Sequence, residues 1–231
     1  MDKSVNDITE KNAYKKYIFK VKNRIFTFDF KEEKCSLWQS MDFMKNYPLQ
    51  EDFLDELFNK YKSNTDEGSV FIKVRVLDSF YSTNLKEGLD DMVKNIISIG
   101  DFDKLLKSGE IKLIDKIKNV KSTRYDTKEC ISFASKYCSR YEKDKFAIYD
   151  KYVKQMLWLI NKATGFAGRV LKIDEIHEMS YKEYCSIVGC FIKKFNEGKP
   201  TKEHINYKSF DRYIWTWAKE ILYKINKGKK V

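Results

Sequence analysis

The chain has 231 residues, of which 42% are hydrophobic and 15% aromatic. That apolar content is enough for a packed core and excludes a disordered chain, and the length suits one globular unit with at most a small appendage. Lysine and arginine number 45 against 34 acidic residues, which gives a net charge of +11. Such an excess favours an anionic partner, although a lysine-rich proteome is an alternative explanation.

Hydropathy and cysteine usage both indicate an intracellular protein. No segment has the roughly 18 apolar residues of a membrane-spanning helix, and the polar start lacks a signal-peptide core. We therefore expect a cytoplasmic protein with no membrane contact. The cysteines include no C-x-x-C pair, which predicts reduced and mostly buried thiols at Cys35, Cys130, Cys138, Cys185 and Cys190.

The first element expected along the chain is a β-hairpin. Residues 17–30 place β-branched and aromatic side chains at alternate positions, with a turn-like step at Lys22 and Asn23. From residue 51 onward apolar side chains recur at helical spacing instead. We therefore divide the chain into an N-terminal segment, residues 1–50, and a helical domain, residues 51–231. The expected helices span 51–62, 69–82, 86–99, 101–107, 110–118, 127–139, 150–161, 180–196 and 207–224.

Several helix ends carry recognisable signals. Ser180 precedes Glu183 by three residues, which predicts a full capping box, and the segment 162–179 before it is expected to be a loop. Three more side chains are placed to cap a helix: Asp101, Ser108 and Thr127. Helix stops are expected at Gly100, Gly198 and Pro200.

The sequence argues against several kinds of chemistry. His177 and His204 lie far apart, and neither has a second ligand three or four residues away, so we expect no metal site. There is no glycine-rich phosphate loop and no G-x-S-x-G elbow. Nucleotide hydrolysis and serine-hydrolase chemistry are therefore excluded, and no cofactor is expected.

The segment 131–153 is the most informative for function. It reads I-S-F-A-S-K-Y-C-S-R-Y-E-K-D-K-F-A-I-Y-D-K-Y-V. Small side chains at Ser132, Ala134 and Cys138 alternate with Lys136, which lets another molecule approach closely. Fourteen residues after the lysine, Asp150 follows an apolar run and opens a helix, where an aspartate commonly acts as the cap. Taken alone, Lys136 fits a solvated lysine and Asp150 a plain cap.

Together these residues resemble the helix-hairpin-helix superfamily of DNA glycosylases and lyases. Its bifunctional members, such as 8-oxoguanine glycosylase and endonuclease III, carry G-x-G-x-K-x-A followed by an apolar stretch that ends in an aspartate. This chain has S-F-A-S-K-Y-C and then F-A-I-Y-D-K-Y-V. The resemblance implies that Lys136 is the amine nucleophile and Asp150 the catalytic carboxylate. Ser132 and Ala134 replace both hairpin glycines, and the cysteines are too few for an iron–sulfur cluster.

The resemblance extends over about residues 69–223. Residues 80–85 resemble the polar segment that fills the space left by an extruded base, and the helix after residue 207 resembles the aromatic wall of the base pocket, although most of its aromatic side chains are expected in the core. The substrate and DNA contacts implied in this way are Tyr81, Ser82, Asn84, Ser135, Arg140, Phe210, Asp211 and Trp215. Tyr213 and Trp217 are further aromatic candidates for the pocket.

The expected fold is mainly α, with two helical lobes around a cleft, as in helix-hairpin-helix glycosylases, and a small N-terminal β-hairpin outside. The expected function is excision of a damaged base from double-stranded DNA, 8-oxoguanine by default, with lyase activity through a Schiff base on Lys136. A monomer is expected. The alternative is a non-catalytic protein on the same scaffold that recognises distorted or modified DNA. The two differ in whether Lys136 is buried beside Asp150 in a cleft or points to bulk water.

Overall fold

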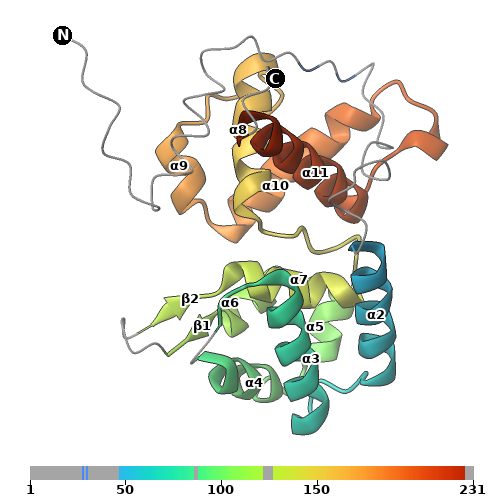
Figure 1. Ribbon diagram of the computed structural model, residues 1–231, viewed down its shortest axis with the longest axis vertical. Helices are drawn as coiled ribbons and strands as arrows, with labels where there is room; N and C mark the ends of the chain where they lie inside the picture. The colour runs from blue at the N-terminus through green and yellow to red at the C-terminus, as the bar shows by residue number, and fades with distance from the viewer. Residues whose placement is uncertain (1–27, 29, 31–46, 86–87, 122–126, 227–231) are drawn as a thin grey trace.

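The computed structural model describes residues 28, 30, 47–85, 88–121 and 127–226. The described chain is mainly helical, as predicted. Figure 1 shows its helices in two groups, one above the other along the longest axis, which we call the N-terminal and C-terminal lobes. The hairpin predicted over residues 17–30 lies outside the described residues, apart from Phe28 and Phe30.

Within the described residues, the N-terminal lobe has six helices and a two-stranded sheet. Helix α3 packs against α2, α4 and α7, and α6 packs against α4, α5 and α7. Strands β1 and β2 pair antiparallel, with Asn119 opposite Glu129. The elements are α2 (Tyr47–Lys60), α3 (Glu67–Tyr81), α4 (Leu89–Ile97), α5 (Phe102–Ser108), α6 (Lys112–Ile117), β1 (Asn119–Val120), β2 (Lys128–Glu129) and α7 (Ile131–Tyr141).

The C-terminal lobe is built around α8, which packs against α9, α10 and α11. Phe28 adds an aromatic side chain to this lobe, since its ring centroid lies 5.8 Å from that of Phe191 and 5.2 Å from that of Trp217. The elements are α8 (Lys151–Thr164), α9 (Ile173–Glu178), α10 (Tyr181–Asn196), the 3₁₀ turn Thr201–Glu203 and α11 (Tyr207–Asn226).

Helical periodicity accounts for the core of each lobe. Val70, Val74 and Leu77 follow one face of α3, and Met156 and Ile160 follow one face of α8, all without solvent exposure. Burial stabilises each such side chain by roughly 1.5–3 kcal/mol relative to exposure. Each lobe is therefore packed around buried apolar side chains.

Two predicted segments have a different secondary structure from the one expected. Helix α9 occupies residues 173–178 in the predicted loop 162–179; it is short and has only Ile176 buried, so its apolar period is weak. The helix expected over 127–139 begins at Ile131 instead, because Lys128 and Glu129 pair with β1.

Two of the capping predictions were right, those for Asp150 before α8 and for Ser180 before α10. Ser180 Oγ accepts from the amide of Glu183 at 3.2 Å, and the Glu183 carboxylate accepts from the amide of Ser180 at 3.1 Å, which completes the predicted capping box. Asp101 precedes α5 without a side-chain cap bond. Ser108 is the last residue of α5 and donates to a carbonyl of its own helix, and Thr127 precedes β2 rather than a helix.

The described thiols are free. Cys130, Cys138 and Cys185 are buried, as predicted, and Cys190 is exposed, while Cys35 lies outside the described residues. Among the helices of the described chain, none is both long enough and apolar enough to cross a membrane.

Candidate active site between the two lobes

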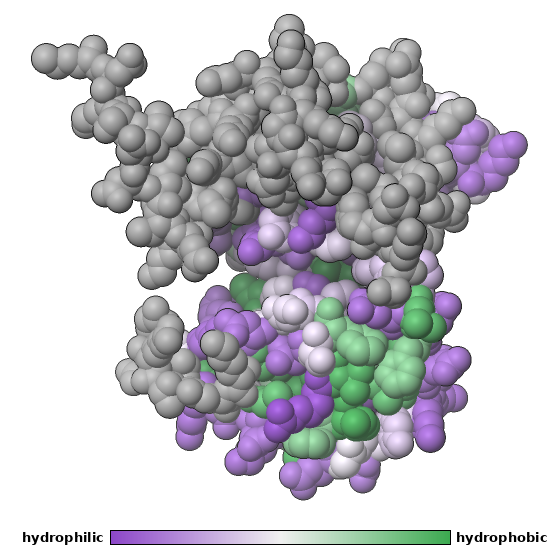
Figure 2. Space-filling view, in the orientation of Figure 1, coloured by the Kyte–Doolittle hydropathy of each residue, from purple (hydrophilic) through white to green (hydrophobic). Residues whose placement is uncertain are grey.

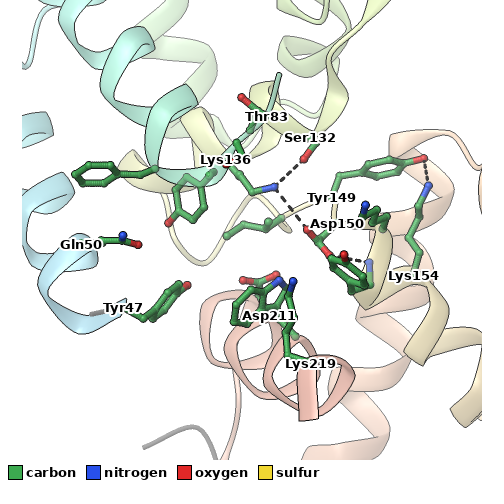
Figure 3. A pocket seen from close by; sticks show the side chains of 17 residues that line it. Tyr47, Gln50, Thr83, Ser132, Lys136, Tyr149, Asp150, Lys154, Asp211 and Lys219 are labelled. Atoms are coloured by element: carbon green, nitrogen blue, oxygen red, sulfur yellow. Dashed lines mark hydrogen bonds and ion pairs between the residues drawn. The ribbon is translucent and has the colours of Figure 1, made fainter. Parts of the chain in front are cut away.

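Lys136 of α7 and the aspartate that opens α8 meet between the lobes (Figure 3). Lys136 Nζ lies 3.9 Å from Asp150 Oδ2 and donates a hydrogen bond to Ser132 Oγ at 2.7 Å. Both side chains are largely buried, with 8% of Lys136 and 16% of Asp150 exposed. The other oxygen, Asp150 Oδ1, caps α8 by accepting from the amides of Tyr152 and Val153 at 2.7 and 3.3 Å. The cap therefore fixes the carboxylate with one oxygen turned toward the lysine.

The chain between α7 and α8 is held by side chains from two helices. The backbone amide of Tyr149 donates to Ser135 Oγ at 3.0 Å, which joins this segment to α7. The hydroxyls of Tyr181 and Tyr184, on α10, donate to the carbonyls of Ala147 and Ile148 at 2.9 and 2.6 Å. These bonds satisfy the backbone of an irregular segment and set the position of Asp150.

The lysine and the aspartate lie at the wall of a cavity of about 540 Å³. A cavity of this size is in the range of small-molecule sites. The N-terminal lobe contributes Tyr47, Gln50, Phe80, Tyr81, Ser82, Thr83, Ser132 and Lys136 to its lining. The remaining lining residues come from the segment before α8 and from the C-terminal lobe: Ile148, Tyr149, Asp150, Lys151, Tyr152, Lys154, Asp211, Trp215 and Lys219.

Aromatic rings form much of this cavity's surface. The rings of Tyr47 on α2 and Trp215 on α11 stack across the two lobes, with centroids 5.8 Å apart and an interplanar angle of 22°. Lys136 Nζ lies 5.6 Å from the ring centroid of Tyr81. Flat aromatic surfaces beside an amine and a carboxylate suit a planar ring attached to a polar group.

Asp211 places a second carboxyl group at the cavity. Its side chain is 5% exposed, and its Oδ1 has no hydrogen-bond partner within the described part of the chain. Burial raises the pKa of Asp211 to about 7; the positive charge of Lys208 opposes this rise and the negative charge of Asp150 adds to it. The group therefore changes protonation near neutral pH, unlike an ordinary aspartate.

Lys154 is a second buried lysine of the cavity lining. Its Nζ donates to Tyr149 Oη at 2.8 Å, and burial lowers its pKa to about 8. Within the described residues, no group of three or more histidine, cysteine, aspartate or glutamate side chains is arranged to hold a metal ion.

Comparison with known proteins places the chain in a family. A family model named HI_0787_N, described as an N-terminal domain, matches residues 30–145. The chain belongs to this family. An uncharacterized protein of Haemophilus influenzae is 34% identical over 155 residues, which are 67% of this chain and 69% of the relative. No solved structure matches the chain.

The boundary of the HI_0787_N domain coincides with the junction of the lobes. The matched residues end at 145, between the end of α7 at Tyr141 and the start of α8 at Lys151. Lys136 therefore lies inside the HI_0787_N domain, whereas Asp150 and helices α8 to α11 lie beyond it. The cavity requires both parts.

The structure brings six of the ten residues predicted for the site to this cavity. They are Lys136, Asp150, Tyr81, Ser82, Asp211 and Trp215. The resemblance to helix-hairpin-helix glycosylases implied that these residues share one site, and their roles stay predictions. Trp215 is the member of the aromatic α11 set that lines the cavity, since Tyr213 is fully buried and Trp217 packs against Phe28.

The other four predicted residues lie elsewhere. Asn84 is exposed and its carbonyl accepts from Lys128 Nζ at 2.5 Å, outside the cavity lining. Ser135 is buried and used by the bond to Tyr149. The guanidinium of Arg140 is 2% exposed and pairs with Glu51 and Asp55, which removes it from any surface contact with DNA. Phe210 is a core residue, 1% exposed.

Part of the lining was not predicted from the sequence. Tyr47 and Gln50 precede residue 51, where the helical domain was predicted to begin, but α2 starts at Tyr47. Pro48, in the first turn, was a helix-start signal that could have placed this boundary. Lys154 and Lys219 had no distinguishing local signal, because they differ from the many other lysines only in where their helices pack.

Proposed function

We propose that this protein is a DNA glycosylase with lyase activity, acting on a base that is extruded into the cavity between the lobes. The observation that carries the proposal is the pair of Lys136 and Asp150, largely buried and 3.9 Å apart at the cavity wall. A helix-hairpin-helix glycosylase scaffold, a monomeric state and a cytoplasmic location are part of the same proposal. 8-Oxoguanine is the default base in this proposal.

The chemistry assigned to the pair is nucleophilic displacement at the sugar. As the bond between C1′ and the base breaks, positive charge develops on the sugar, and the Asp150 carboxylate stabilises it. The Lys136 amine forms a bond to C1′, and the departing base takes up the proton that the amine loses. Ring opening gives an imine, and loss of the C2′ proton then expels the 3′ phosphate.

The cavity walls support binding of an extruded base. Removing a base from the stack costs a few kcal/mol, which stacking against aromatic side chains offsets in part. Trp215 and Tyr47 supply such surfaces, and the carboxyl group of Asp211, a lining residue, supplies a polar group beside them.

A non-catalytic DNA-binding protein is the second candidate. Ser132 stands where the hairpin of helix-hairpin-helix glycosylases has glycine. Its hydroxyl accepts a hydrogen bond from Lys136 Nζ at 2.7 Å. That bond restrains the amine and favours a protein that recognises distorted or modified DNA without cutting it.

Borohydride trapping separates the two candidates. The wild type is incubated with duplexes that carry 8-oxoguanine or an abasic site, together with the variants Lys136→Gln and Asp150→Asn. Lys154→Gln is the matched control, because Lys154 is similarly buried and lines the same cavity. The proposal expects a covalent adduct that survives Lys154→Gln and is lost in Lys136→Gln. Salt-sensitive DNA binding without any adduct would support the non-catalytic candidate.

A further inference from the structure

One buried carboxylate joins the two lobes beside the cavity. Glu51 on α2 is 3% exposed. Its carboxylate forms ion pairs with Lys208 Nζ at 2.7 Å and Arg212 Nη2 at 3.2 Å, both on α11. It also accepts hydrogen bonds from Arg140 of α7 and from the hydroxyl of Tyr81 on α3. Glu51 therefore links three helices of the N-terminal lobe to one helix of the C-terminal lobe.

The ion-paired residues share a helix face with the cavity residues. Positions 208, 211, 212 and 215 of α11 follow the spacing of three and four residues that defines one side of a helix. Lys208 and Arg212 bind Glu51, while Asp211 and Trp215 line the cavity. The position of the ion pairs and the position of this cavity wall are thus mechanically coupled.

Glu51 is charged in the folded protein. Burial by itself favours its neutral form, but the positive charges of Lys208 and Arg140 hold the pKa of Glu51 well below its ordinary value. Three cations converge on this carboxylate. If Glu51 were neutral, these cations would face each other in a buried space without a compensating charge. Leaving buried charges unpaired in this way is strongly unfavourable.

We infer that Glu51 is a positioning residue, whose ion pairs with Lys208 and Arg212 hold α11 against the N-terminal lobe so that Asp211 and Trp215 face the Lys136 amine. The inference rests on the proposed function only for the reaction at Lys136 that this placement of α11 would assist. The placement of α11 by Glu51 can be tested without an activity assay.

The test compares Glu51→Gln with Asp55→Asn in protein labelled with 5-fluorotryptophan. Asp55 lies one turn further along α2 and pairs with Arg140 and Lys143, both in the N-terminal part. The ¹⁹F resonance of Trp215, assigned with Trp215→Phe, is expected to shift in Glu51→Gln and to stay in place in Asp55→Asn. Trapping on an abasic duplex is expected to slow by about 10- to 100-fold in Glu51→Gln alone, because misplacement by about 1 Å can cost that much.

The double variant Glu51→Gln/Lys208→Met distinguishes positioning from stability, and it also serves if the single variant folds poorly. Removing both charges is expected to raise the melting temperature above that of Glu51→Gln, because one fewer buried cation lacks a partner, while the displaced Trp215 resonance and the slow trapping persist. Recovery of trapping together with the melting temperature, or an unmoved Trp215 resonance in Glu51→Gln, would overturn the inference. If the wild type forms no adduct but the resonance moves as expected, the proposed function fails and the positioning role stands.

Discussion

The backbone amide of Tyr149 donates a hydrogen bond to Ser135 Oγ at 3.0 Å, across the junction between α7 and the segment before α8. Lys136 follows Ser135 in the chain, and Asp150 follows Tyr149. This bond therefore explains how two residues 14 positions apart come within 3.9 Å of each other.

Ser135→Ala removes the acceptor of this bond. The bond is partly buried, and a fully buried amide without a partner costs about 1–3 kcal/mol, so we expect a loss of about 1 kcal/mol in the free energy of unfolding. Chemical denaturation measures it. We also expect less adduct in the borohydride experiment, because Asp150 is no longer held beside Lys136.

The matched control for that variant is Ser98→Ala. Ser98 Oγ donates to the carbonyl of Asn95 at 2.9 Å, but Ser98 is exposed. Its replacement is expected to change the free energy of unfolding by no more than about 0.5 kcal/mol. An equal loss in both variants would contradict a special role for the bond to Tyr149.

The raised pKa of Asp211 predicts that the stability of the folded protein depends on pH in an unusual way. The folded protein holds the Asp211 proton up to about pH 7, whereas the unfolded chain, with the ordinary pKa of 3.8, releases it earlier. The folded state therefore binds more protons between these values, and the free energy of unfolding falls as pH rises through this range. The three-unit difference corresponds to a loss of up to about 4 kcal/mol above pH 7.

Asp211→Asn is expected to abolish that loss. Denaturation of the wild type and the variant at pH 4.5 and pH 8 should show the variant gaining stability relative to the wild type at the higher pH. The exposed Asp90→Asn is the control, for which we expect no such gain. A constant difference between Asp211→Asn and the wild type at both pH values would refute the prediction.

Substitutions of Trp215 and Trp217 are expected to have different effects, the first on DNA binding and the second on stability. Stacking on a base contributes about 1–3 kcal/mol, so Trp215→Ala is expected to weaken binding of a duplex that carries an extruded base by that amount. Trp217→Ala instead removes a ring that packs against Phe28, which should lower the melting temperature and leave the affinity unchanged. Fluorescence anisotropy and thermal unfolding measure the two effects, and equal losses of affinity would count against the stacking role.

Two lysines at the cavity are candidates for phosphate contacts. Lys219 Nζ lies 4.1 Å from the ring centroid of Tyr152, and Lys151 Nζ lies 4.8 Å from the same centroid. Each phosphate contact contributes about 0.9 to the slope of log affinity against log salt. We therefore expect Lys151→Gln and Lys219→Gln each to reduce that slope by about 0.9 in a salt titration. The exposed Lys193 of α10 is the control, and a similar reduction in Lys193→Gln would argue against a localised contact.

The sequence by itself determined the features that depend on local spacing. The apolar period located most of the helices, and the Ser180 capping box formed as predicted because its partners lie three residues apart. Asp150 was correctly placed as a helix cap for the same reason. That Lys136 and Asp150 would come together was implied by the resemblance to helix-hairpin-helix glycosylases and not by local spacing.

Only the tertiary structure decided which side chains surround that pair. Arg140 was expected to contact DNA, yet packing of α7 against α2 buries it against Glu51. The ion pairs of Glu51 with α11 join residues more than 150 positions apart, and no local pattern encodes such a contact. Hydrogen bonds within a helical turn follow from sequence spacing, whereas burial, ion pairing and the raised pKa of Asp211 follow from the packing of distant helices.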